Sequence, residues 1–168
     1  IESYLACINK AGMDALVVSS EAQAMAKSVV PDSNFGYFAL IYIHRDMVNI
    51  YISFGQNIIF SSFAQLPQNS APNLFDSFVR AELTKSIDYC KEKNILKKDK
   101  SGAEPIIKCI ICGVYELTVS VGNLLSKDGF TVSLANVWTN AFSLEEYVPD
   151  ISFDKSLLFA GNAGLFLE

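Results

Sequence analysis

The chain has 168 residues, of which 51% are apolar and 18% are charged. This composition supports one compact domain with a substantial core and excludes an intrinsically disordered chain. The formal net charge is −5, and the basic run at residues 91–100 is interrupted by acidic residues, which argues against a nucleic-acid-binding protein. No apolar run reaches the roughly 18 residues that a membrane-spanning helix needs. The chain begins at Ile1 rather than at a methionine and shows no signal peptide, so we expect it to be part of a longer protein.

The first thirty residues are expected to form two helices around a short strand. Apolar residues at helical spacing predict a helix over residues 2–11. The sequence DALVV predicts a short buried strand over residues 14–18. Ser20, followed by an acidic and Ala-rich stretch, is typical of a helix start and predicts a second helix over residues 21–29. A loop at residues 31–36, rich in turn-forming residues, marks the boundary between two parts of the chain.

From residue 37 onward, three strand-like runs with tight polar connections are followed by helices that alternate with strands. The longest helix is predicted over residues 74–94, where the apolar residues fall on one face. The predicted elements are strands at 37–44, 47–54, 57–64, 106–112 and 130–134, and helices at 74–94, 117–126 and 154–167. This order predicts an α/β fold with a mixed five-stranded sheet and helices on both faces. This order resembles the ribonuclease-H-like arrangement that forms one half of an actin-like ATPase.

Two of the four cysteines, Cys109 and Cys112, form a CxxC within an apolar run. Side chains three positions apart in a strand point to opposite faces, so these two cannot hold one metal ion or form a disulfide without breaking the strand. The single histidine, His44, offers no partner for a zinc site. We therefore expect buried structural thiols, no metal site and the reducing environment of a cytoplasm.

Five stretches, which together span nearly all of the chain, carry a family resemblance. They read YLACINKAGMDALVVSSEAQAMAKSVV, LIYIHRDMVNIYISFGQNIIFSS, RAELTKSIDYCKEKN, IKCIICGVYELTVSVGNLLSKDGFTVSLANVW and SLLFAGNAGLFLE. Their order and spacing resemble the second half of the PilM family, the actin-like cytoplasmic proteins of type IV pilus assembly, and more distantly FtsA and the cytoplasmic part of GspL. The resemblance implies that residues 1–30 are the end of the first actin-like half. Residues 37–168 would then be the second, ribonuclease-H-like domain.

In this family the opening hairpin of the second half contacts a nucleotide. Its pattern is D-I-G-x-x-x-T, in which the Asp manages magnesium and the Gly lets the backbone approach the phosphates. In this chain Tyr42 stands at the Asp position and His44 at the Gly position. The family's adenosine turn, S-G-G-G-A, is CGVYE here, where Gly113 is retained but Val114 and Tyr115 would fill the space of the base. The resemblance therefore implies cofactor-binding positions that are degenerate.

Functions of two classes follow from the resemblance. The first is a scaffold of the type IV pilus platform, without a cofactor, which binds the cytoplasmic tail of a PilN-like membrane protein and other platform proteins at the inner membrane face. The second is half of a working actin-like ATPase that binds ATP and magnesium at the interface with a first half, for which Tyr115 would have to stack on the base. A GspL-like scaffold of type II secretion is a further variant of the first class. We expect a scaffold without catalytic residues or a nucleic-acid partner, held at the membrane through its partners and able to oligomerise.

Other residues have two interpretations each. The segment His44, Arg45 and Asp46 is either a polar hairpin tip or a small functional triplet. Glu21 either lines the cleft between the two halves, as the resemblance implies, or stabilises a helix start through the helix dipole. Trp138 either anchors a partner or packs within a loop.

Overall fold

The computed structural model describes residues 1–15, 18–33, 35–67, 74–98, 102–138, 140–142, 147 and 149–167. Two helices come first, three strands follow, and helices and strands alternate afterwards. They are α1 (Glu2–Lys10), α2 (Glu21–Val29), β1 (Tyr37–Ile43), β2 (Met47–Phe54), β3 (Asn57–Gln65), α3 (Phe75–Glu92), β4 (Ile107–Gly113), α4 (Tyr115–Lys127), β5 (Thr131–Leu134), α5 (Phe153–Ser156), the 3₁₀ helix η2 (Leu157–Phe159) and α6 (Ala160–Leu165).

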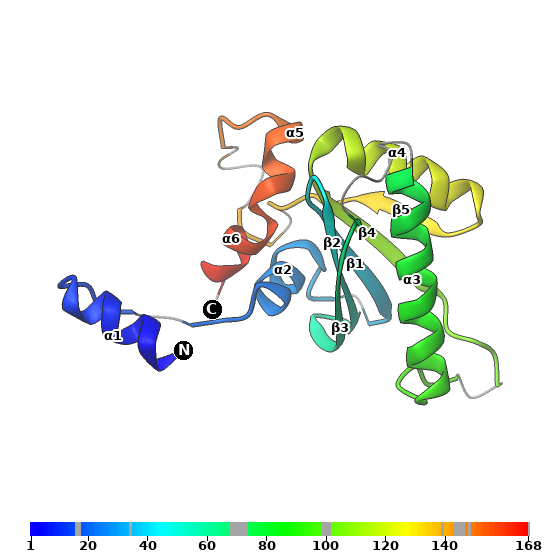
Figure 1. Cartoon of the computed structure of the whole chain (residues 1–168), viewed down its shortest axis with the longest axis horizontal. Coiled ribbons are helices and arrows are strands. Elements are labelled where there is room, and N and C mark those ends of the chain that lie inside the picture. Colours follow the sequence, from blue (N-terminus) through cyan, green and yellow to red (C-terminus); the bar gives the residue numbers. More distant parts are fainter. Residues whose placement is uncertain are drawn as a thin grey trace.

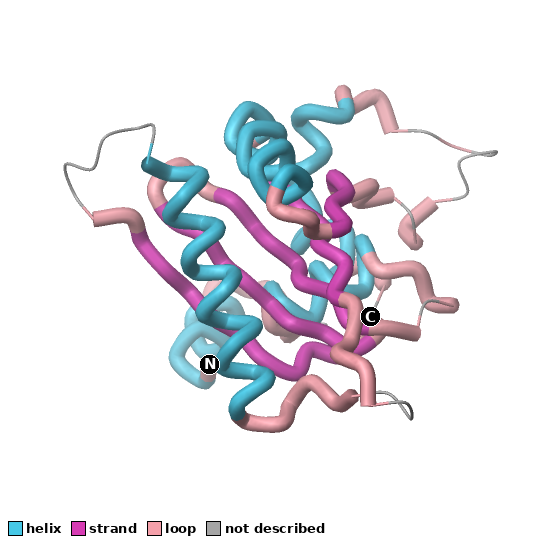
Figure 2. Tube along the Cα trace, turned by 90° about the vertical axis from the view of Figure 1, so that its right-hand side faces the viewer, coloured by secondary structure: helices cyan, strands magenta, loops and turns pink. Residues whose placement is uncertain are grey.

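Five strands form one sheet in the order β3-β2-β1-β4-β5. β1 and β3 both pair antiparallel with β2, because tight turns connect these three strands. β4 pairs in parallel with β1 and with β5, because helices α3 and α4 carry the chain back across the sheet. Helices lie on both sides of the sheet (Figures 1 and 2). The predicted α/β fold with a mixed five-stranded sheet is therefore confirmed.

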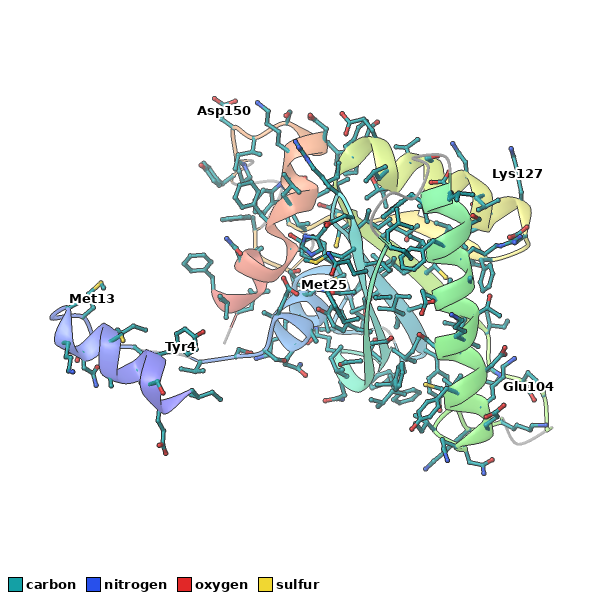
Figure 3. The ribbon with its side chains drawn as sticks, viewed as in Figure 1. Tyr4, Met13, Met25, Glu104, Lys127 and Asp150 are labelled. Carbon is teal, nitrogen blue, oxygen red and sulfur yellow. The ribbon has the colours of Figure 1, made fainter. Side chains whose placement is uncertain are left out.

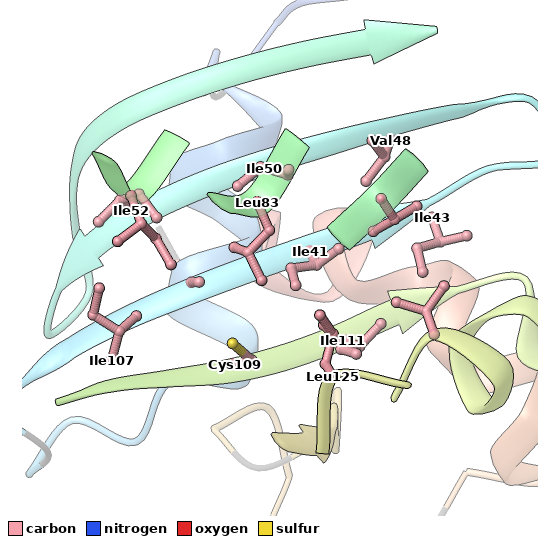
Figure 4. Close-up of a cluster of buried hydrophobic side chains, with 14 of the residues drawn as sticks. Ile41, Ile43, Val48, Ile50, Ile52, Leu83, Ile107, Cys109, Ile111 and Leu125 are labelled. Atoms are coloured by element: carbon pink, nitrogen blue, oxygen red, sulfur yellow. The ribbon is translucent and has the colours of Figure 1, made fainter. Parts of the chain in front are cut away.

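The larger core lies between the sheet and helices α3 and α4. Ile41 of β1 and Ile111 of β4 point to this side and are fully buried. Leu83 of α3 and Leu125 of α4 pack against them (Figure 4). Burying each of these side chains contributes about 1.5–3 kcal/mol to folding. The apolar stripe of α3 is formed by Phe75, Val79, Leu83, Ile87 and Cys90.

Helices α2 and α6 cover the opposite face of the sheet and pack very closely together. A Cβ atom added at Gly164 of α6 would lie 1.6 Å from the carbonyl oxygen of Ala24 in α2. Ser28 Oγ donates to the Ala160 carbonyl oxygen over 2.7 Å, which fixes a second point of the same helix pair. Small residues on both helices permit this approach, because a larger side chain would hold the two backbones apart.

The two cysteines of β4 lie on opposite faces of the sheet, as predicted. Cys109 belongs to the core beneath α3 and α4, and Cys112 belongs to the core beneath α2. Burial raises the pKa of the Cys109 thiol to about 12, and burial also raises the pKa of the Cys112 thiol. Both thiols are therefore protonated at neutral pH and pack as small apolar groups.

Helix α1 projects away from the rest of the chain. None of its residues is buried, and it lies apart from α2 (Figure 1). Tyr4 on α1 and Met13 just after it are exposed, whereas Met25 on α2 lies in the interior (Figure 3). The apolar side of α1 is therefore not covered by the sheet or its helices.

Two elements differ from the sequence prediction. The predicted strand over residues 14–18 is not formed at positions 14, 15 and 18, which are exposed, while positions 16 and 17 lie outside the described residues. The helix predicted over residues 154–167 is divided into α5, η2 and α6. Leu157 in η2 is buried in the core beneath α2, and α6 then packs along α2. Tertiary packing therefore interrupts the helical pattern.

Candidate functional site

The carboxyl ends of the parallel strands β1 and β4 meet at one edge of the sheet, the place where open α/β sheets bind ligands. Tyr42 and His44 flank Ile43 at the end of β1. Gly113 is aligned with Ile43 across the pair, and Tyr115 begins α4 directly afterwards. The structure therefore brings all four predicted cofactor-binding positions to the same edge.

Tyr42 places a buried phenol at the position where the family pattern has the carboxylate of an aspartate. Its side chain is 9% exposed, and its hydroxyl donates to the Leu158 carbonyl oxygen of η2 over 3.1 Å. Burial, with smaller contributions from Cys112 and Glu21, raises the pKa of Tyr42 to about 12. The phenol is therefore neutral at physiological pH and offers no negative charge to a magnesium ion.

Tyr42→Phe is expected to lower the free energy of unfolding by about 1 kcal/mol at neutral pH, because a buried hydrogen bond is lost. The raised pKa adds a pH dependence. The folded protein keeps the phenolic proton up to about pH 12, whereas an unfolded tyrosine loses it near 10.0. The stability from this group is therefore complete below pH 10 and is lost as the pH rises toward 12. Urea unfolding at neutral and alkaline pH should show a smaller alkaline loss in Tyr42→Phe than in the parent chain, and equal losses would refute this assignment.

His44 closes the β1–β2 hairpin beside Tyr42. Its ring centroid lies 4.4 Å from that of Tyr42, and its Nε2 atom is buried without a hydrogen-bond partner in the described part of the chain. Asp46 accepts a hydrogen bond from Gln65 Nε2 over 3.2 Å, which links the turn to the end of β3. In the structure the segment His44, Arg45 and Asp46 thus forms the polar tip of a hairpin.

Gly113 is required by the close approach of β1 and β4. Its φ is +115°, and a Cβ atom at this position would lie 1.9 Å from the Ile43 carbonyl oxygen. Only glycine combines this backbone conformation with this contact. The retained glycine of the family turn is therefore accounted for by strand packing alone.

Tyr115 stands at the same edge with 39% of its surface exposed. It is the first residue of α4, and its carbonyl oxygen accepts from Thr118 Oγ1 over 2.7 Å. Together with Tyr42 and His44, it supplies an aromatic ring where the family pattern has only aspartate and glycine. Three aromatic rings therefore gather at this edge of the sheet.

Glu21 joins the start of α2 to strand β2. Its Oε2 atom accepts from the Tyr51 hydroxyl over 2.8 Å and from Asn49 Nδ2 over 3.0 Å. Burial, followed by the hydrogen bond to Glu21, raises the pKa of Tyr51. Sequence reasoning missed both partners, although the period-two pattern of β2 places residues 49 and 51 on one face. Glu21 therefore does more than favour a helix dipole, because it also attaches α2 to the sheet.

Within the described ranges, no three His, Cys, Asp or Glu side chains gather as a metal ion would require. In the same part of the chain, no helix combines the length and the apolar character needed to cross a membrane.

A second candidate site is an apolar groove beside α6. It has a volume of about 430 Å³, and its lining includes Trp138, Phe142, Phe159, Asn162, Ala163 and Phe166. The Trp138 and Phe142 rings pack edge to face with centroids 5.4 Å apart. Trp138 also packs against the core beneath α2, so it is both a packing residue and part of the groove wall.

Comparisons with known proteins find structures of similar fold but no matching sequence family. No protein-family model matches the chain, and no curated protein matches it. Among solved structures, a PilM-PilN type IV pilus biogenesis complex is similar with a TM-score of 0.57 and 15% sequence identity, over 99% of this chain and 56% of that chain. The ethanolamine utilization protein EutJ from Carboxydothermus hydrogenoformans has a TM-score of 0.49 and 10% identity, over 95% of this chain and 57% of that chain. A protein of actin-like ATPase fold from Bacteroides thetaiotaomicron has a TM-score of 0.42 and 11% identity, over 69% of this chain and 37% of that chain.

The chain thus spans little more than half the length of the pilus protein that it resembles in structure. At these identities the likeness concerns the fold. The chain is therefore similar in fold to that part of the pilus protein.

Proposed function

We propose that this chain is part of a PilM-like scaffold that binds partner proteins of the type IV pilus platform and whose nucleotide site is lost or much weakened. The observation that carries the proposal is the filling of the β1–β4 edge by Tyr42 and His44. The similar solved structure is a complex of PilM with PilN, and this likeness supports the proposal at the level of the fold.

Nucleotide binding at this edge would need free polar groups. Magnesium requires oxygen ligands, and phosphates require N–H donors or cations around them. Here the Tyr42 hydroxyl donates to the Leu158 carbonyl oxygen, and the Val114 N–H donates to the Ile43 carbonyl oxygen over 2.9 Å. These groups are already used within the protein, which supports a scaffold rather than an ATPase.

The proposed partner is the cytoplasmic tail of a PilN-like membrane protein. In the similar solved structure, PilM is in complex with PilN. A scaffold of this kind would lie at the cytoplasmic face of the inner membrane and would be held there by its partner. Because the chain spans 56% of that PilM chain, part of the partner surface would belong to residues other than these.

Titration with a fluorescent synthetic tail of a PilN-like protein from the same organism tests this partner. We expect saturable binding of the tail by the protein and none of a scrambled tail of identical composition, because peptide capture depends on the order of side chains in a groove. Equal anisotropy changes with both peptides, or no change with either, would refute the partner assignment.

The competing function is half of a working actin-like ATPase. The feature in its favour is Tyr115, a residue 39% exposed at the edge, whose aromatic ring has the chemistry to stack on a base. In that case Tyr42 and His44 would have to move aside when MgATP binds. A GspL-like scaffold would share the loss of the nucleotide site and differ in its partners.

A further inference from the structure

The end of the sheet that lies opposite the candidate nucleotide site carries a concentration of lysines. Residues 89–108 contain six of the 13 basic residues of the chain and three of its 18 acidic residues, so this segment is basic in a protein whose net charge is −5. It comprises the last turn of α3, the chain that follows it and the start of β4 (Figure 1). We call Lys91, Lys93, Lys97 and Lys98 the lysine patch, and all four are exposed.

The fold fixes the positions of the lysines that follow α3. Asn94 turns the chain at the end of the helix with a φ of +55°. Leu96 is buried in the core beneath α3, and the Lys97 N–H donates to the Tyr37 hydroxyl over 3.0 Å. The helix dipole favours cations in the last turn of α3, but Lys97 and Lys98 lie beyond that turn. A solvated helix end therefore does not account for them.

One carboxylate lies among these lysines and is outnumbered by them. Glu104 Oε1 is 3.0 Å from Lys98 Nζ, and Glu104 Oε2 is 4.0 Å from Lys91 Nζ. These three residues and Lys97 line one hollow of about 270 Å³, which keeps positive charge after this pairing. Lysine is almost never fully buried unless it is paired. A surface that covers the lysine patch therefore has to carry negative charge.

Exposed apolar side chains border the lysine patch. Ile106 is 77% exposed and lines a second hollow together with Lys91. Tyr89 is 45% exposed, and Lys93 Nζ lies 5.9 Å from the centre of its ring. Lysines interleaved with exposed aliphatic and aromatic side chains suit a lipid headgroup layer, where cations pair with phosphates and apolar groups enter the acyl boundary. A nucleic-acid backbone would use the lysines but not Ile106.

We propose that the lysine patch and Ile106 dock this protein on a bilayer surface that is rich in anionic lipid. The charge distribution favours this occupant over a small acidic partner, because a plane of negative charge attracts the basic end and repels the acidic remainder. In that orientation the β1–β4 edge with Tyr42 and Gly113 points away from the lipid. Clusters of about four to eight cations bind anionic leaflets, so four lysines predict weak and reversible docking.

Cosedimentation with lipid vesicles tests the proposal, with the whole protein that contains this chain and without partner proteins. We expect binding to vesicles of equal parts phosphatidylglycerol and phosphatidylcholine, and none to vesicles of phosphatidylcholine alone. Raising the salt concentration from about 0.1 M to about 1 M should release the protein, because the Debye length falls from about 10 Å to about 3 Å.

Lys97→Gln/Lys98→Gln should weaken binding to the anionic vesicles at least about tenfold. Lys127→Gln/Lys155→Gln is the matched control, because it removes the same charge from α4 and α5. Figure 3 shows Lys127 far from Glu104, which marks the lysine patch. Since salt screens distant charges, the control should change the affinity by less than about twofold. All four lysines are exposed, so both variants keep the fold.

Glu104→Gln should strengthen binding about fivefold, because it removes the carboxylate that pairs with the lysine patch. Asp150→Asn makes the same change of charge far from the patch and should leave the affinity unchanged (Figure 3). Ile106→Ser should weaken binding several-fold at each salt concentration where binding is measurable, since apolar burial is not screened. Phe63→Ser, at a 62% exposed position near the other end of the sheet, is its control and should have no effect.

Three results would overturn the docking. The first is equal binding, or no binding, of the whole protein to the two kinds of vesicle. The second is equal weakening of anionic-vesicle binding by the patch variant and by its lysine control. The third is binding of a single-stranded oligonucleotide or of polyglutamate that is lost in Lys97→Gln/Lys98→Gln, with no binding to vesicles, which would assign the patch to another anionic partner. The docking does not rest on the pilus proposal, since a protein that binds no PilN-like tail should still bind anionic vesicles.

Discussion

Gly113→Ala is expected to lower the free energy of unfolding by about 3 kcal/mol or more. A residue with a Cβ is strained at a φ of +115°, which costs about 1–3 kcal/mol. The new Cβ would also lie 1.9 Å from the Ile43 carbonyl oxygen, so β1 and β4 would have to separate where they end. Overpacking of this kind costs about another 1–3 kcal/mol. Urea unfolding followed by circular dichroism measures the loss.

Gly129→Ala is the matched control for this effect. Gly129 also has a positive φ, +89°, but a Cβ there would meet nothing within 4 Å. Alanine at this position adds only backbone strain, and we expect it to lower the free energy of unfolding by about 1–2 kcal/mol. If Gly113→Ala costs no more than Gly129→Ala, the strand contact does not explain the glycine, and a role for Gly113 in binding a nucleotide returns.

Gly164→Ala is expected to destabilise the protein by a similar amount for a different reason. The residue is helical, so alanine would improve helix propensity by up to about 1 kcal/mol. Its Cβ, however, would lie 1.6 Å from the Ala24 carbonyl oxygen, which forces α2 away from α6. Separating these helices opens the core that contains Met25 and Leu157. We expect a net loss of about 2–3 kcal/mol in urea unfolding.

Gly161→Ala is the control that separates the effect of the α2–α6 contact from the effect of the change in helix propensity. This glycine lies in the same helix, but a Cβ there would meet only the Glu21 Cγ, at 3.4 Å, which belongs to a flexible side chain. We expect a change between zero and a stabilisation of about 1 kcal/mol. Equal losses for Gly161→Ala and Gly164→Ala would mean that the α2–α6 contact is not as close as described.

Much of the fold could be predicted because it follows from the local spacing of apolar residues along the sequence. The helical stripe of α3 and the alternation of β4 side chains between the two faces of the sheet follow from side-chain direction alone. The same rule placed Cys109 and Cys112 on opposite faces, as the structure confirms. The prediction failed for the final helix, because Leu157 turns into the core at η2, and that turn depends on α2 rather than on local spacing.

The family resemblance singled out Tyr42 and Gly113, but only the structure places them at one edge, because β1 pairs in parallel with β4. The hydrogen bond from Tyr42 to Leu158 joins residues 116 positions apart, and that from Tyr51 to Glu21 joins residues 30 apart. No local pattern specifies such partners.

We propose that the edge formed by β1 and β4 does not bind nucleotide. Calorimetric titration of MgATP into the whole protein that contains this chain measures this binding. We expect no heat of binding up to about millimolar nucleotide, which corresponds to a binding free energy weaker than about −4 kcal/mol. Saturable binding in the micromolar range would contradict it, since Tyr42, His44 and Tyr115 would then not block the site, and the chain would be half of a nucleotide-gated switch.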